Sequence, residues 1–163
     1  MQADAVKCLA SGSYNPTSHK RIDDDLPTRD LPMSRDRIDC PCGSGRLYPA
    51  CCARWHMGSF KLRAPDPEAL MRSRFTAYVM DDLIYLRDTW APETRPATIE
   101  KNPENLKWLG LAIKSVDMQD DDHATVTFVA RYRLSGRGMR MEETSRFRRE
   151  RQRWLYVDGD VKD

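Results

Sequence analysis

The chain has 163 residues, with 27 Lys and Arg against 25 Asp and Glu, five Cys, and a formal net charge of +2. This length allows one ordinary domain plus a small module, because domains typically run to about 100–150 residues. No stretch approaches the ~20 apolar residues of a membrane span, and residues 1–7 lack the apolar run of a signal peptide. We therefore expect a cytoplasmic protein, whose reduced thiols are available to a metal rather than committed to disulfides.

Residues 1–38 mix Ser, Pro, Asp and basic residues without apolar periodicity. Such a segment buries too little apolar surface to offset the entropy lost on ordering. The sequence therefore predicts a disordered N-terminal tail over residues 1–38, with a free thiol at Cys8 and no assigned function.

Four cysteines follow in two pairs, as Cys40-Pro41-Cys42-Gly43-Ser44-Gly45 and then Cys51-Cys52. Four thiolates meet the tetrahedral preference of zinc and leave no position open for water or substrate, so such a site is structural. Residues 39–63 are too few to bury a core, and a structural zinc ion can supply about 10–16 kcal/mol of folding free energy instead. A vicinal Cys51–Cys52 disulfide or separate buried cysteines are alternatives, but neither explains the Gly-Ser-Gly turn.

Trp55-His56 follows the second pair directly. His56 could replace a cysteine ligand, but we favour a place outside the ligand set, packing over the site or donating to a thiolate. Residues 40–63 hold four basic side chains and no acidic one, so a thiolate cluster has counter-charge nearby. We expect this module to present Arg46, Tyr48 and Arg54 to a partner.

The next segment carries the signals of two helices. Asp66 is a typical N-cap residue and Pro67 suits the first helical position. Large apolar residues then recur at helical spacing and share one face, and they are Met71, Phe75, Tyr78 and Val79. Asp81 or Asp82 can cap a second short helix, which Ala91-Pro92 would end because proline cannot continue the ladder. Its side is lined by Leu83, Leu86, Arg87 and Trp90.

Beyond residue 107 the apolar residues recur with period two, as in half-buried strands. One face of residues 124–134 carries Ala124, Val126, Phe128, Ala130, Tyr132 and Leu134. Neighbouring strands are expected over residues 108–113 and 139–150, the latter after a turn at 135–138, and a fourth over 154–157 before Asp158-Gly159. Helices followed by a four-strand antiparallel meander predict an α+β domain over residues 64–160.

These motifs resemble a known family. The Cys-Pro-Cys-Gly-Ser-Gly and Cys-Cys pairs resemble the SEC-C zinc motif, and several later segments are similar, in order, to the YchJ-like family of bacterial SEC-C proteins. The segments are 66–78, Tyr85-Leu86, Thr89-Trp90, 108–111, 128–132, 145–147 and 154–159. The resemblance implies a nuclear-transport-factor-2-like (NTF2-like, cystatin-like) cone with a curved sheet and N-terminal helices behind a small zinc knuckle. It also implies structural Zn²⁺ on Cys40, Cys42, Cys51 and Cys52, but no particular activity.

Charge is unevenly distributed along the chain. Residues 64–130 hold seven basic and twelve acidic side chains, whereas residues 131–153 hold nine arginines and three glutamates. The surplus arginines can be solvated, with Arg131 and Arg133 facing Glu142 or Glu143 across strands, or can meet RNA phosphates, an acidic protein or a small anion. Candidates for a cone pocket or anion site are Arg131, Arg133, Glu142, Arg146, Tyr156 and Asp158, although Asp158 before Gly159 is also typical of a turn.

No nucleophile and base can be paired from spacing, so we assign no catalytic residue. The favoured hypothesis is a cytosolic, non-catalytic zinc-binding adaptor that meets a protein or ribosomal partner through residues 39–63. One alternative is a small-ligand carrier or enzyme that uses the cone pocket. The other is RNA binding through the Arg-rich strands at 131–153.

Overall fold

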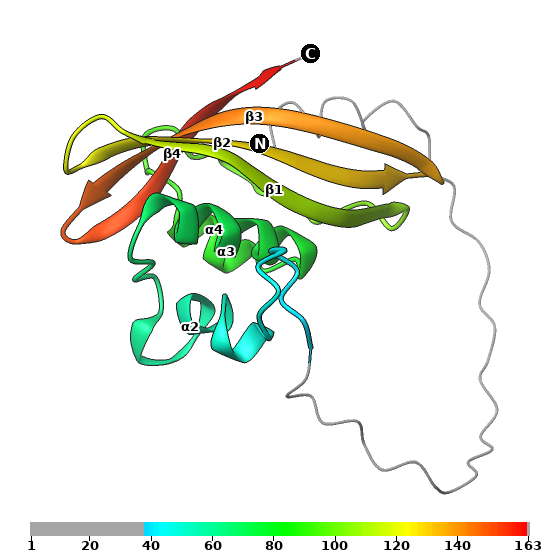
Figure 1. Ribbon diagram of the computed structural model, residues 1–163, viewed down its shortest axis with the longest axis horizontal. Coiled ribbons are helices and arrows are strands. Elements are labelled where there is room, and N and C mark those ends of the chain that lie inside the picture. The colour runs from blue at the N-terminus through cyan, green and yellow to red at the C-terminus, as the bar shows by residue number, and fades with distance from the viewer. Residues whose placement is uncertain (1–37, 163) are drawn as a thin grey trace, which may run out of the picture.

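The computed structural model describes residues 38–162, and the predicted tail up to residue 37, with Cys8, lies outside the described residues (Figure 1). The elements in chain order are η2 (Tyr48–Ala50), α2 (Ala53–His56), η3 (Gly58–Phe60), α3 (Pro67–Val79), α4 (Leu83–Asp88), β1 (Leu106–Met118), β2 (His123–Leu134), β3 (Arg137–Glu150) and β4 (Arg153–Lys162). The strands form one antiparallel sheet in the order β1-β2-β3-β4. Helices followed by this meander confirm the α+β prediction.

The described chain is arranged in three layers (Figure 1). The curved sheet is the first, α3 and α4 lie against its inner face, and the segment with α2 lies beyond these helices. Because α3 is covered from both sides, nine of its thirteen residues are buried, polar ones included. Within residues 38–162 no helix combines the length and apolar character needed to cross a membrane.

Helices α3 and α4 begin where their caps were predicted. Asp66 Oδ1 accepts a hydrogen bond from Ala69 N at 2.7 Å, with Pro67 at the first helical position. Asp82 Oδ1 accepts from Tyr85 N at 3.0 Å in the same way. Each carboxylate satisfies a backbone donor that the first turn leaves without an intrahelical partner.

The predicted end of α4 at Ala91-Pro92 is wrong, because the helix already ends at Asp88. The Thr89 hydroxyl bonds back to the carbonyl of Tyr85 at 2.7 Å. Trp90 then leaves the helical path and pairs as a parallel bridge with Tyr156 of β4. The chain therefore already pairs with β4 before it reaches Pro92.

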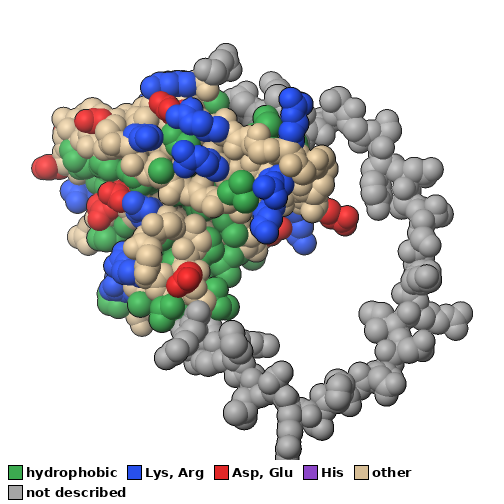
Figure 2. Space-filling view, turned by 45° about the vertical axis from the view of Figure 1, so that its right-hand side comes forward, with side chains coloured by type: hydrophobic (Ala, Val, Ile, Leu, Met, Phe, Trp, Pro, Cys, Tyr) green, Lys and Arg blue, Asp and Glu red, His purple; other side chains and the backbone are tan. Residues whose placement is uncertain are grey.

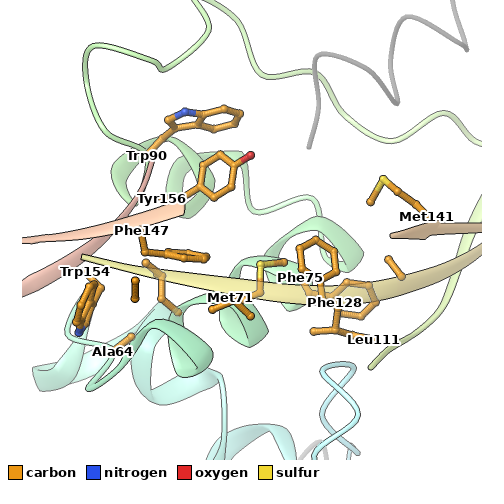
Figure 3. Packing of buried hydrophobic residues seen from close by; sticks show 14 residues of the cluster. Ala64, Met71, Phe75, Trp90, Leu111, Phe128, Met141, Phe147, Trp154 and Tyr156 are labelled. Carbon is orange, nitrogen blue, oxygen red and sulfur yellow. The ribbon is translucent and has the colours of Figure 1, made fainter. Parts of the chain in front are cut away.

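The main core lies between α3 and the inner face of the sheet (Figure 3). Met71 and Phe75 of α3 belong to the same buried cluster as Phe128 of β2 and Phe147 of β3. The predicted alternation of β2 is confirmed, since Ala124, Val126, Phe128 and Ala130 are all buried. The sheet therefore presents one apolar face to the helices.

The turn between β2 and β3 uses only Ser135 and Gly136, with φ of 48° and 81°. Positive φ at both central residues is the type I′ geometry that matches the twist of a hairpin. This turn is shorter than the predicted connection over residues 135–138, so Arg131 lies opposite Arg140. The expected pairing of Arg131 and Arg133 with Glu142 or Glu143 is therefore wrong.

Asp158-Gly159, expected after the fourth strand, lies inside β4, where Gly159 pairs with Ser145 of β3. A Cβ at Gly159 would lie 2.7 Å from Glu143 Cδ and closer still to its Oε1. Glycine is thus present because the buried Glu143 side chain occupies the space that any other residue would need. The dipeptide is a packing feature of the sheet and not a turn.

Candidate metal centre

The sulfur atoms of Cys40, Cys42, Cys51 and Cys52 all lie within 4.8 Å of one another, and all four residues are buried. The Cys42 and Cys51 sulfurs are 3.6 Å apart and the Cys51 and Cys52 sulfurs 3.9 Å apart. A tetrahedral ion with metal–sulfur bonds of 2.3 Å places its ligands about 3.8 Å from one another. The four predicted ligands therefore have the spacing of a tetrahedral thiolate site and can hold a metal ion. All four are free thiols, so no vicinal disulfide forms.

The chain reaches this arrangement through a turn that depends on glycine. Gly43 and Gly45 have φ of 74° and 73°, a region that residues with a side chain rarely adopt. Cys40 N donates to the carbonyl of Arg46 at 2.8 Å and closes the turn between the two cysteine pairs. The Ser44 hydroxyl lies 3.2 Å from Cys51 Sγ, where it can donate to a thiolate.

The electrostatics of the cluster favour a bound cation. Hydrogen bonds from the Cys42 and Cys52 thiols lower the pKa of Cys40 to about 3. Hydrogen bonds of Cys52 to Cys40 and Cys42 raise the pKa of Cys52. The pKa values of Cys40 and Cys52 thus move in opposite directions, because adjacent negative charges repel one another. A divalent cation removes that repulsion and releases the remaining protons as it binds.

His56 joins the cysteine module, residues 39–63, to α3. Its Nε2 lies 2.9 Å from the carbonyl of Ser73, and its Nδ1 lies 2.9 Å from the Tyr48 hydroxyl. Because a carbonyl can only accept, Nε2 carries the proton and Nδ1 accepts from Tyr48. Both ring nitrogens are engaged, so the structure does not support the expected donation to a thiolate. Burial lowers the pKa of His56 and keeps the imidazole neutral.

This neutral histidine predicts a loss of stability in mild acid. The folded pKa lies below the ordinary 6.5, so the unfolded chain binds more protons as pH falls past that value. The contribution of the neutral His56 to the free energy of unfolding is fully present above pH 6.5. It declines as the pH falls from there toward the folded pKa. We expect His56→Gln to unfold more easily at pH 7.5 but to lose less stability between pH 7.0 and 5.5 than the wild type. Denaturant melts at both pH values measure this.

The exposed His123 provides the matched control for that experiment. His123→Gln removes an imidazole from an exposed ion pair with Asp120, and because exposed pairs contribute little, its pH slope should differ from the wild type by less than that of His56→Gln. A wild-type slope in His56→Gln would show that this histidine does not govern the acid response. Protonation of the cysteines contributes equally to all three proteins, so the difference between slopes isolates the imidazole.

Further contacts seat the cysteine cluster on α3 and β1. Arg72 Nη1 donates to the carbonyl of Cys42 at 2.9 Å, and Thr76 Oγ1 lies 3.7 Å from Cys40 Sγ. A Cβ at Gly43 would stand 3.0 Å from the carbonyl oxygen of Leu111 in β1. The module is therefore packed tightly against the larger domain, and an ion bound to it stabilises that contact.

Of the side chains expected at a partner surface, Arg46 and Arg54 are exposed, whereas Tyr48 is half-buried and bonded to His56. The Arg54 guanidinium lies 4.9 Å from the ring centre of Trp55 and 5.7 Å from that of Phe60. Three large apolar side chains of the module are exposed as well, and they are Leu47, Met57 and Phe60. The module thus presents a surface that is both apolar and cationic.

The six residues predicted for a pocket or anion site are not brought together in one cavity. Tyr156 is buried in the core, whereas the other five lie on the outer face of the sheet, and they are Arg131, Arg133, Glu142, Arg146 and Asp158. A surface hollow of about 430 Å³ lies elsewhere, between α4 and the segment that follows it. Its walls are Leu83, Ile84, Arg87, Pro92, Arg95, Pro96, Ala97 and Ile99.

Sequence reasoning missed two charged residues in the interior of the cone. Arg74 is 1% exposed, donates through Nη1 to the carbonyl of Leu86 at 2.8 Å, and lies 4.5 Å from the ring centre of Tyr156. Glu143 is fully buried and accepts from the hydroxyls of Ser145 and Tyr156 at 2.6 and 3.3 Å. The period-two pattern of β3, which places Glu143 between Met141 and Phe147 on the inner face, could have identified the glutamate.

With this geometry established, comparison with known proteins identifies the family. The model of the YchJ middle NTF2-like domain matches residues 66–159. The chain belongs to the YchJ-like family. Among curated relatives, a UPF0225 protein of Bordetella pertussis is 58% identical over 123 residues, which cover 76% of this chain and 92% of the relative. A UPF0225 protein of Ralstonia nicotianae is 46% identical over 145 residues, covering 82% and 99%.

Solved structures of SEC-C motif containing proteins have the same fold as this YchJ-like chain. The solution structure of one from Rhodopseudomonas palustris is 32% identical, with a TM-score of 0.66, and covers 77% of this chain and 100% of its own. A crystal structure from Psychrobacter arcticus, 23% identical, has a TM-score of 0.62 and covers 82% and 86%. The predicted family and NTF2-like fold are thereby confirmed.

Proposed function

We propose that this chain is a cytoplasmic zinc-binding interaction protein without catalytic activity. Structural Zn²⁺ on Cys40, Cys42, Cys51 and Cys52 folds residues 39–63 into a rigid knob that contacts a protein or ribosomal surface. The observation that carries the proposal is the closed, buried cluster of four sulfurs, which leaves a metal no free position for a substrate. An ion held in this way stabilises the fold of the module and does not take part in a reaction.

The surface of the cysteine module supports a role in binding a partner. Arg46 and Arg54 are exposed, as are the large apolar side chains of Leu47, Met57 and Phe60, and residues 40–63 contain no acidic residue. Arginine and aromatic residues are the types enriched where proteins bind one another. The ligand-carrier alternative has less support, because Arg74, Glu143 and Tyr156 occupy the interior of the cone.

The test combines metal analysis with surface substitution. We expect one zinc ion per chain in reduced, freshly purified protein, and specific partners that crosslink to the full chain in cells. Arg46→Glu/Arg54→Glu should lose those partners while keeping its zinc and its melting temperature.

Lys101→Glu/Lys114→Glu makes the same charge change at exposed positions outside the cysteine module and should retain every partner. A protein without bound metal would overturn the proposed zinc site. Equal recovery of partners by both double variants would overturn the proposed surface.

A further inference from the structure

The arginines of the strands differ in whether acidic residues neutralise them. Toward one end of the sheet, Arg146 pairs with Asp158 and Asp160, Arg148 with Glu93 and Glu150, and Arg149 with Asp122. Arg131 and Arg133 lie toward the other end and are exposed. Neither has a carboxylate within 4.0 Å among residues 38–162. The positive surplus of the sequence is therefore concentrated near the β2–β3 turn.

The strand register places more cations beside these two arginines. Arg133 pairs with Lys107 of β1, and Arg131 pairs with Arg140 of β3. Residues paired across neighbouring strands share a face, and these lie on the outer face because the inner one carries the core. Lys162 occupies the next row, opposite Glu142. We call this group the basic patch, which consists of Lys107, Arg131, Arg133, Arg140 and Lys162.

One carboxylate lies within the basic patch, and it is already shared. Glu142 bonds to Arg140 at 2.5 Å and to Lys162 at 3.1 Å. Like charges directly opposite one another destabilise a sheet, and here Lys107 opposes Arg133 and Arg131 opposes Arg140. Figure 2 shows Lys and Arg side chains gathered over the sheet on the face turned toward the viewer. A bound polyanion would relieve this repulsion.

The geometry of the patch favours an extended anion over a small one. Alternate residues on a strand are about 6.6 Å apart and neighbouring strands about 4.8 Å, so the cations form an open grid without enclosing walls. Arg131 and Arg133 are free to place their planar guanidinium groups against phosphate oxygens through paired hydrogen bonds. A repeating phosphate chain can meet several of these groups at once.

We propose that the basic patch binds the phosphate backbone of a nucleic acid. The aromatic rings at this end, Trp108 and Tyr132, pack against each other at 5.5 Å and belong to the core, so they offer no platform for bases. Binding is therefore independent of sequence and dominated by charge. The basic patch lies on the outer face of the sheet, whereas the cysteine module lies on the inner side, where α3 packs, so its function is separate from the interaction proposed above (Figure 1).

The experiment titrates the full-length, metal-loaded protein into a fluorescently labelled 20-nucleotide RNA of mixed sequence, at several salt concentrations. We expect affinity to fall as salt rises, and a DNA strand of the same sequence to bind within a few-fold of the RNA. Arg131→Gln/Arg133→Gln should weaken binding about tenfold and make the slope of log K against log salt shallower by about 1.4, because two phosphate contacts are lost.

The matched control is Arg146→Gln/Arg149→Gln, which removes the same charge from the same sheet at positions that already have acidic partners. This variant should bind like the wild type. Equal weakening by both double variants, or no binding by the wild type at low salt, would overturn the proposal. So would polyglutamate that competes as well as RNA at equal charge, since it would show that the patch accepts an acidic protein.

Discussion

Replacing Cys51 and Cys52 with serine is expected to release the metal and unfold residues 39–63 while the sheet keeps its strand pairing. A structural zinc ion contributes about 10–16 kcal/mol to the folding of a small module, and no core within these residues replaces it. The loss reaches the larger domain, because His56 would no longer bond to Ser73, nor Arg72 to the carbonyl of Cys42. We therefore also expect a lower melting temperature.

Amide NMR spectra measure this outcome residue by residue. Signals from the cysteine module should collapse to unfolded positions, those of α3 should shift, and those of β2 and β3 should stay dispersed. Cys8→Ser is the control, since it removes a thiol from outside the predicted ligand set and should leave the metal bound. A well-dispersed module in the double serine variant would show that packing, and not an ion, folds residues 39–63.

The cysteine cluster and the helix starts could be predicted because their signals are local in the chain. Four cysteines in two close pairs constrain one another through short turns, and Asp66 and Asp82 each cap the helix that directly follows. The inner face of β2 could be predicted as well, since the alternation of apolar and polar residues along one strand does not depend on its neighbours. For each of these features, the residues that determine it lie within a few positions of one another.

Features that depend on register could not be predicted in the same way. A four-residue connection would have placed Arg131 opposite Glu142, whereas the two-residue turn places it opposite Arg140. The sequence Ser-Gly-Arg-Gly is compatible with either turn, and a shift of two residues preserves which face is buried. The basic patch is a consequence of that register, so it became visible only once strand partners were known.

The burial of Glu143 and the position of Gly159 are linked, and neither could be inferred from the other in the sequence. An Asp-Gly dipeptide is typical of a turn, and that local preference hid its place in the middle of β4. The glycine is needed by a carboxylate sixteen residues earlier in the chain. Only the pairing of β3 with β4 brings the two together.

Gly159→Ala is expected to destabilise the fold by about 2–3 kcal/mol, because overpacking of this kind typically costs 1–3 kcal/mol. The added methyl would stand 2.7 Å from Glu143 Cδ, so the carboxylate must move away from the hydroxyls of Ser145 and Tyr156. A buried carboxylate that loses hydrogen bonds is costly, and there is little room for it to move among the core side chains. Denaturant unfolding measures the change.

Gly138→Ala supplies the matched control, because a Cβ there meets nothing within 4 Å in the same sheet, and its effect should stay within about 0.5 kcal/mol. Glu143→Ala removes the obstructing atoms, so adding Gly159→Ala to it should cost much less than in the wild type. Such coupling is the signature of two residues that compete for one space. Additive losses in the double variant would instead mean that Gly159 is required for its backbone and that the carboxylate does not determine the residue at this position.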